Sequence, residues 1–285
     1  MLEQLAVIAN LTVHSWTARA HERRGDDAVV DAYDCGGTPG AVGRYTKRLV
    51  DHTYHTYKVL VRSIGALRAA HRTMTLPWGE GGRLLPASLL EDYKRDTERL
   101  GDYFLESARV FQGGSKFIKA EAAQRLGRIY VEADYDGMTA PDAFSWAVTY
   151  TPVPTDDFRV GMSAGMRKTM MESVRRVERE AVAGVVPEIV ERMAAALQRV
   201  VTVTGDPEAR VYQSLLENVR TLGELLPNFN LLGDPRVAAV IADFACLGAY
   251  TKDDIQSSVV ARQQCNAQAL QVMERLKGVG QWLNT

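Results

Sequence analysis

The residues whose types could do chemistry gather in one part of the chain, where cations are interleaved with aromatic side chains. Between residues 41 and 75 there are seven Lys and Arg residues and a single acid, Asp51, so this window carries a formal charge of +6 against −7 for the other 250 residues. Phosphates attract Lys and Arg, and exposed aromatic rings stack nucleic-acid bases. The window is therefore typical of a site for single-stranded nucleic acid.

The candidate contacts in this site are of two kinds. The predicted phosphate contacts are Arg44, Lys47, Arg48, Lys58 and Arg62, with Arg19, Arg23 and Arg24 extending the groove. The predicted base-stacking residues are Trp16 and Tyr45. The same residues allow an alternative, in which Trp16 covers a helix and the cations form an ordinary solvated face.

Other chemistries find little support in the sequence. Gly36 to Gly43, followed by Arg44, could present backbone N–H groups to a phosphate, but they lack the Gly-Lys-Ser/Thr of a nucleotide loop. His52 and His55 share a helical face, yet no carboxylate or cysteine cluster completes a metal site. No hydrolase or zinc-protease motif occurs. The sequence therefore predicts no metal, no cofactor and no enzymatic activity.

The elements that position the candidate residues follow from hydrophobic periodicity. Residues 5 to 18 alternate apolar and polar side chains, which predicts a strand with Trp16 on its polar face. Residues 144 to 151 alternate in the same way. From about Arg44 to Leu67 the 3.6-residue period predicts a helix with one apolar face and one cationic ridge. A further helix at about 115 to 132 carries a weaker basic surface, made by Lys116, Lys119, Arg125 and Arg128.

From about residue 165 to the end the pattern is helical. Pro187 is expected to kink or divide the first of these helices. Asp206 and Asp234, each followed by proline, are expected to cap the starts of two more, and Thr251 with Asp254 resembles a capping box.

A group of methionines, Met162, Met166, Met170 and Met171, lies at helical spacing around the start of the first of these helices. We interpret them as core residues, and an adaptable partner interface is the alternative.

The fold class predicted from these elements is α+β, with a small antiparallel sheet packed with helices and a mostly helical second half. Residues 1–160 are expected to form the basic, aromatic nucleic-acid-binding part and residues 161–285 the helical part, packed on the first as one compact unit.

Composition narrows the class of protein. Hydrophobic residues make up 46% and charged residues 24% of the chain, as in ordinary globular proteins. No stretch approaches the ~20 apolar residues of a membrane span, and the N-terminus has no basic leader. The three cysteines are odd in number and show no paired spacing. We therefore expect neither membrane insertion nor export, and a reducing cytoplasm.

Several blocks of the sequence resemble a family of tailed-phage proteins. The blocks are Ala9–Arg19, Gly43–Leu49, Arg72–Trp78, Arg83–Pro86, Val153–Arg159 and Leu225–Pro235. Together they are most similar to the Drc-type single-stranded-DNA-binding RNA polymerase cofactors of lytic podoviruses. The resemblance spans about residues 5 to 235 and includes no catalytic motif.

This resemblance implies a non-enzymatic early viral protein that acts in the host bacterial cytoplasm. It implies a preference for single-stranded DNA, a fold that is not an OB-fold, and a role in transcription in which the protein helps a phage RNA polymerase engage DNA. It assigns no individual contact residue.

The sequence thus predicts sequence-independent binding of single-stranded DNA by a phage transcription cofactor. The runner-up is a protein–protein adaptor or structural phage protein whose helical half binds a partner. A homo-oligomer is compatible with both hypotheses.

Overall fold

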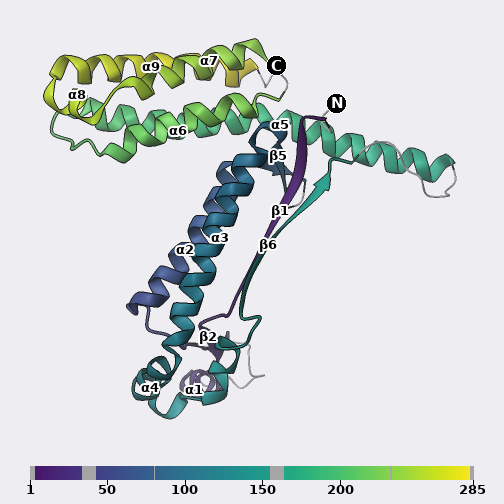
Figure 1. The fold of residues 1–285 in the computed structure, drawn as a ribbon, viewed down its shortest axis with the longest axis vertical. Helices are drawn as coiled ribbons and strands as arrows, with labels where there is room; N and C mark the ends of the chain where they lie inside the picture. Colours follow the sequence, from purple (N-terminus) through teal and green to yellow (C-terminus); the bar gives the residue numbers. More distant parts are fainter. Residues whose placement is uncertain (1–3, 34–42, 80, 155–163, 232, 283–285) are drawn as a thin grey trace. The chain divides into compact units, whose positions relative to one another are not determined.

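The computed structural model describes residues 4–33, 43–79, 81–154, 164–231 and 233–282. Helices dominate, and the strands form a four-stranded sheet of order β4-β5-β1-β6 and a two-stranded sheet of β2 and β3 (Figure 1). The strand pairs β1–β5, β4–β5 and β2–β3 are antiparallel. The predicted α+β class with a small antiparallel sheet is therefore confirmed.

The chain divides into two compact units that differ from the predicted parts. Unit 1 comprises residues 1–10, 72–91 and 150–285, and unit 2 comprises residues 11–71 and 92–149. The first residues of the chain join the helical second half because β1 pairs with β5, with Ala6 opposite Pro86 and Ala9 opposite Arg83. All ten predicted DNA-contact residues lie in unit 2.

Four elements run from one unit into the other. They are β1 (Ala6–Ser15), α2 (His55–Thr73), α3 (Leu90–Gly113) and β6 (Phe144–Pro152). The two strands lie where alternation predicted them.

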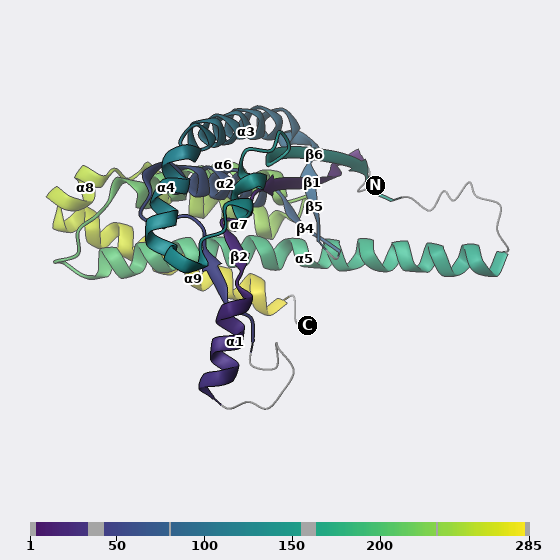
Figure 2. The same ribbon diagram turned by 90° about the horizontal axis from the view of Figure 1, so that it is seen from below.

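Unit 1 is mainly a helical layer. Its own elements are β4 (Leu76–Trp78), β5 (Gly82–Pro86), η2 (Ala87–Leu89), α5 (Ala164–Gly205), α6 (Gln213–Phe229), α7 (Pro235–Cys246), η5 (Leu247–Ala249), α8 (Lys252–Ser257) and α9 (Val259–Trp282). The C-terminal half of α5 packs against α6 and α9 through a stripe of buried side chains that includes Ile189, Met193, Leu197 and Val200. Its N-terminal half extends beyond the other helices of the unit (Figure 2).

Two of the predicted helix signals in unit 1 behave differently from expectation. Helix α5 continues through Pro187 and is not divided there. Pro187 and Ala183 are both exposed, so water can bind the carbonyl that loses its N–H donor. Asp206 accepts the N–H of Glu208 at 3.0 Å in a turn, and α6 begins only at Gln213.

The other two signals are confirmed. Asp234 caps α7 by accepting the N–H of Arg236 at 2.8 Å, with Pro235 in the first turn. Hydrogen bonds that the Arg236 side chain and backbone N–H donate to its carboxylate lower the Asp234 pKa to about 2. Thr251 and Asp254 form a capping box at the start of α8, but α8 ends at Ser257 and α9 is a separate helix.

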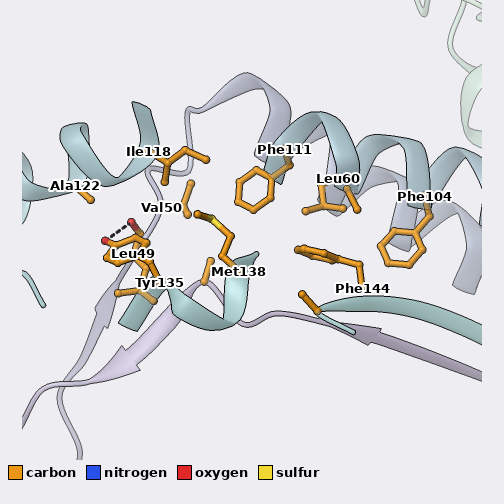
Figure 3. Close-up of a cluster of buried hydrophobic side chains, with 13 residues drawn as sticks. Leu49, Val50, Leu60, Phe104, Phe111, Ile118, Ala122, Tyr135, Met138 and Phe144 are labelled. Carbon is orange, nitrogen blue, oxygen red and sulfur yellow. Dashed lines mark hydrogen bonds between the residues drawn. The ribbon is translucent and has the colours of Figure 1, made fainter. Parts of the chain in front are cut away.

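Unit 2 is built around an aromatic core. Its own elements are β2 (Arg19–His21), α1 (Arg23–Ala32), β3 (Thr46–Arg48), α4 (Ser115–Leu126), η3 (Gly127–Ile129) and η4 (Glu132–Met138). Phe104, Phe111 and Phe144 meet in its centre (Figure 3). The Tyr135 hydroxyl donates to the Leu49 carbonyl at 2.9 Å, which fixes the chain directly after β3.

The helix expected from about Arg44 begins only at His55. Residues 46–48 form strand β3 instead, and the expected cationic ridge is split between a strand and a helix. The cause is tertiary pairing: Thr46–Arg48 align with Arg19–His21. Pairing with a neighbouring strand overrides a local helical period.

Among the described helices, none is long and apolar enough to cross a membrane.

Candidate nucleic-acid interface

Strands β2 and β3 pair as a two-stranded antiparallel ribbon, with α1 between them in the chain. This ribbon, which we call the β2–β3 hairpin, places two arginines opposite each other. Arg19 is the register partner of Arg48, and both side chains are exposed. Residues directly opposite on antiparallel strands have Cβ atoms about 5 Å apart, so the two positive charges repel each other. Within the part of the chain that the structure describes, no carboxylate oxygen lies within 4.0 Å of either guanidinium group.

The hairpin continues past β2 and β3 and gathers further arginines. The Glu22 N–H donates to the Tyr45 carbonyl at 3.0 Å, which extends the pairing by one residue beyond the strands. Arg23, the first residue of α1, and Arg44, two residues before β3, flank this bond and are both exposed. Arg24 is exposed in the first turn of α1, and its Nη1 donates to the Arg128 carbonyl at 3.2 Å. We call the five arginines on this hairpin the hairpin cluster: Arg19, Arg23, Arg24, Arg44 and Arg48.

Lys47 lies on the opposite side of the hairpin and is buried, with 2% of its side chain exposed. Its Nζ donates to Glu22 at 2.8 Å and to the Ile129 carbonyl at 2.7 Å, and lies 2.9 Å from Asp134 Oδ2. Burial alone would lower the Lys47 pKa, but the bonds to Glu22 and Asp134 raise it. The prediction that Lys47 contacts phosphate does not agree with this placement, because its charge is already neutralised inside the protein.

Asp26 orders the edge of the hairpin that carries Tyr45. Its carboxylate accepts the Tyr45 N–H and pairs with His21 Nε2, each at 2.5 Å. The bond from the Tyr45 N–H and the one from His21 lower the Asp26 pKa. The Tyr45 ring lies against Gly25, where an added Cβ would come within 2.5 Å of the ring, yet 49% of Tyr45 remains exposed. Tyr45 can therefore offer an aromatic surface beside Arg44.

Trp16 packs into the core instead. The centroid of its ring lies 6.2 Å from that of Phe111 and 6.3 Å from that of Tyr135. Its backbone N–H donates to the Ala143 carbonyl at 2.8 Å. This placement agrees with the alternative that Trp16 covers a helix, here α3 at Phe111, and it does not agree with a base-stacking role.

Helix α4 connects the hairpin to the rest of unit 2. Arg125 donates from Nη1 to the Arg48 carbonyl and from Nη2 to the Leu49 carbonyl, both at 3.1 Å, and from Nε to Glu121 at 2.9 Å. This arginine, which the sequence placed on a weaker basic surface, holds the end of β3 in place.

Lys58 and Arg62 form a second cationic group. Both are exposed and lie one turn apart on α2. Because α2 starts at His55, they do not share an element with Arg44 and Arg48. The structure thus provides two cationic groups in unit 2 where the sequence predicted one ridge.

An aromatic pair that the sequence analysis did not predict joins the partly buried Tyr54, directly before α2, to the exposed Phe117 of α4. The rings of Tyr54 and Phe117 are stacked, with centroids 6.0 Å apart and an interplanar angle of 19°. The signal was present in the sequence, since Phe117 lies off the apolar stripe that Ile118 and Ala122 define on α4.

The other candidate chemistries are not supported by geometry. Among the residues described here, no group of three or more His, Cys, Asp or Glu side chains is placed to hold a metal ion. Residues 34–42, with Cys35 and most of the glycine segment, lie outside the described residues, as does Met162.

Comparisons with protein-family models, with curated proteins and with solved structures gave no match. The geometry of unit 2 is therefore the observation on which a functional proposal can be built.

Proposed function

We propose that unit 2 binds single-stranded DNA, without sequence preference, through the hairpin cluster. The observation that carries the proposal is the register pairing of Arg19 with Arg48 on an exposed hairpin face. A phosphate between two guanidinium groups would offset their repulsion and form charge-assisted hydrogen bonds. Of the neighbouring acids, Glu22, Asp26 and Asp134 bond to Lys47, Tyr45 or His21. Glu22 and Asp26 also attract Arg24 and Arg44, and the exposed Asp27 lies one turn after Arg23, so Arg19 and Arg48 are the arginines of the cluster with the least compensated charge.

Local charge is what favours an anionic ligand, because unit 2 as a whole is nearly neutral. Residues 11–71 and 92–149 contain 17 Lys and Arg against 16 Asp and Glu. The exposed arginines of the hairpin cluster, above all Arg19 and Arg48, provide the binding face, whereas the nearby acids Glu22 and Asp26 are buried. Contacts to phosphate carry no base information, which accounts for binding without sequence preference.

The preference for a single strand is supported by Tyr45. Its exposed ring follows Arg44 directly, and bases can stack on such a ring only when they are not paired in a duplex.

The role as a cofactor of a phage RNA polymerase in the host bacterial cytoplasm, without enzymatic activity, rests on the sequence resemblance.

Fluorescence anisotropy tests the proposal. A labelled 30-nucleotide strand and the corresponding duplex are titrated with protein at two salt concentrations. We expect tighter binding of the single strand and weakening by salt. Arg19→Glu with Arg48→Glu should abolish binding at physiological salt and reduce the slope of log K against log salt by about 1.4, since each phosphate contact on a single strand contributes about 0.7.

A matched control has the same change in net charge. Arg95→Glu with Arg99→Glu alters two exposed arginines on α3 that pair with Asp92 and Asp96. This variant should bind like the wild type. Equal loss of binding in both double variants would show that net charge, and not the hairpin cluster, is responsible.

The adaptor hypothesis keeps one observation in its favour. Met166 and Met170 are exposed on the N-terminal half of α5, one turn apart, and are not in the core as predicted. Exposed methionines suit an adaptable protein interface. If the wild type fails to bind DNA even at low salt, a pull-down comparing wild type with Met166→Glu and Met170→Glu tests this surface.

A further inference from the structure

Phe117 is a large apolar side chain held in a place where it cannot be part of the core. Helix α4 buries Ile118 and Ala122, and Phe117 points away from them with 65% of its surface exposed. Full burial of a Phe side chain stabilises a protein by about 1.5–3 kcal/mol, so its exposure forgoes much of that gain. A single exposed apolar residue is ordinary, but this one is also supported by a second ring.

The ring of Tyr54 packs against one face of the Phe117 ring. The two rings are stacked at 6.0 Å, and Tyr54 is packed against the core cluster of unit 2. The Tyr54 hydroxyl lies so close to Gly114 that an added Cβ there would come within 2.8 Å of it. Tyr54 is thus held by its surroundings, and it fixes one face of Phe117. A ring ordered in this way loses little conformational entropy when a ligand stacks on its free face.

The charges around this pair favour an anionic ligand. Lys116 precedes Phe117 in the chain and is exposed. The Lys58 N–H donates to the Tyr54 carbonyl at 3.0 Å, which places Lys58 one turn after Tyr54. Two acids lie close to the pair in the chain. Asp51 accepts the N–H and hydroxyl of Thr53, and Glu121, one turn after Phe117 on α4, pairs with Arg125.

Another exposed ring of unit 2 has the opposite surroundings. Tyr103 is 53% exposed on α3, but it lies between Asp102 and Glu106 in the helix. Glu106 pairs with Arg109, and the exposed Asp102 directly before the ring would repel a phosphate. The contrast indicates that the surface at Phe117 fits a ligand with an aromatic ring and a negative charge, which describes a nucleotide.

Helix α4 also connects this pair to the hairpin cluster. Arg125, near the other end of the helix, is bonded to the Arg48 carbonyl. It lies eight positions after Phe117, a distance of about 12 Å along the axis. Of the residues between them, Ala120 and Gln124 are exposed and uncharged, and Glu121, whose side chain is 35% exposed, pairs with Arg125.

We propose that Phe117, supported by Tyr54, is a base-stacking platform for single-stranded DNA that runs along α4 from the hairpin cluster. The inference rests on the proposed function and extends it to a second site, which contacts bases by stacking and does not contact phosphates.

The test compares two oligonucleotides that differ only in their bases: a 30-nucleotide oligothymidylate and an abasic strand of the same length. Wild-type protein should bind oligothymidylate more tightly. Phe117→Ala should lower affinity for oligothymidylate by about 10-fold or more, as expected for loss of a base stack, and leave affinity for the abasic strand unchanged. Its salt dependence should match the wild type because no counterion is released by stacking.

Two further variants control the experiment. Phe117→Trp should retain binding, and its added indole fluorescence should be quenched by oligothymidylate but not by the abasic strand. Tyr103→Ala should bind both strands like the wild type. An unchanged affinity for oligothymidylate in Phe117→Ala, together with lost binding in Arg19→Glu/Arg48→Glu, overturns the platform and keeps the proposed function. Absence of binding by the wild type overturns both.

Discussion

Arg19 and Arg48 occupy the same register position on the two strands of the β2–β3 hairpin, so its exposed face carries two positive charges directly opposite each other. Like charges in this position are destabilising, and cross-strand charge pairs are worth roughly 0.2–1 kcal/mol. Interactions that reduce the stability of the free protein are common at functional sites, where stability is exchanged for binding. The same pair should therefore have opposite effects on folding and on DNA affinity.

Arg48→Glu separates these two effects. The new carboxylate would face Arg19, so we expect the free energy of unfolding to rise by roughly 0.5 kcal/mol while affinity for single-stranded DNA falls. Urea denaturation at neutral pH measures the first quantity and anisotropy the second. Arg48→Gln, which removes the repulsion without adding an attraction, should lie between Arg48→Glu and the wild type in stability. A less stable Arg48→Glu protein would contradict the assignment of the pair as a source of strain.

Lys47→Met tests the buried ion network. The change leaves the carboxylates of Glu22 and Asp134 without the ammonium group that neutralises them. Breaking a buried pair in this way should reduce the free energy of unfolding by about 3 kcal/mol. Lys58→Met, at an exposed position of α2, is the matched control and should change stability by less than about 0.5 kcal/mol. If the two variants have equal stability, Lys47 is not the structural residue that its burial indicates.

The acids of the hairpin make its folding sensitive to low pH. The hydrogen bond from Lys47 lowers the Glu22 pKa below its usual 4.5, and the N–H of Tyr45 together with His21 lowers the Asp26 pKa below 3.8. A lowered native-state pKa contributes stability that is present above the unfolded-state value and is lost as pH falls through the native value. We therefore expect stability to decline as pH falls from about 4.5.

Urea denaturation at a series of pH values between 7 and 2.5 measures this decline. Asp26→Asn keeps an oxygen that can accept the Tyr45 N–H but has no proton to gain, so its stability should fall less steeply below pH 4 than that of the wild type. Parallel pH profiles for the two proteins would exclude Asp26 as one of the groups responsible.

The elements that the sequence predicted well are those defined by local signals. The alternation in residues 144 to 151 corresponds to β6, and the Asp234 cap forms as its side-chain chemistry requires. The predicted start of helix α2 was too early, because Thr46–Arg48 follow a helical period in the sequence. Pairing with β2 makes these residues a strand instead. The partner of Lys47 is Ala20, 27 residues earlier, so a short stretch of sequence around Lys47 contains no sign of the pairing.

The candidate site was predicted in composition but not in arrangement. Arg19 and Arg48 were both selected, yet their pairing depends on hairpin register, which the sequence does not display. Lysine and tryptophan are residue types that often contact DNA at a protein surface. In the fold, however, Lys47 bonds to Glu22 and Trp16 packs against Phe111, and these partners come close only when the chain folds. Phe117 lies outside the basic window of residues 41 to 75, so the charge pattern does not point to it.

The last prediction compares two helical glycines, of which one approaches Trp146 at the core of unit 2 and the other is exposed. Gly101 is buried in α3, and an added Cβ would overlap the indole ring of Trp146 on β6. Gly65 lies on the exposed face of α2, and an added Cβ would have no neighbour within 4 Å. The two Gly→Ala changes are chemically identical, so a difference between them isolates the effect of packing.

Gly65→Ala should raise the free energy of unfolding by about 0.5–1 kcal/mol, because alanine has the higher helix propensity. Gly101→Ala gains the same propensity but must displace the Trp146 ring, and overpacking of this kind costs about 1–3 kcal/mol. Urea denaturation followed by tryptophan fluorescence measures both variants, and only Gly101→Ala should shift the native emission spectrum. Equal stabilities would mean that Trp146 has another position to occupy, and the close approach of α3 to β6 would then contribute nothing to the stability of unit 2.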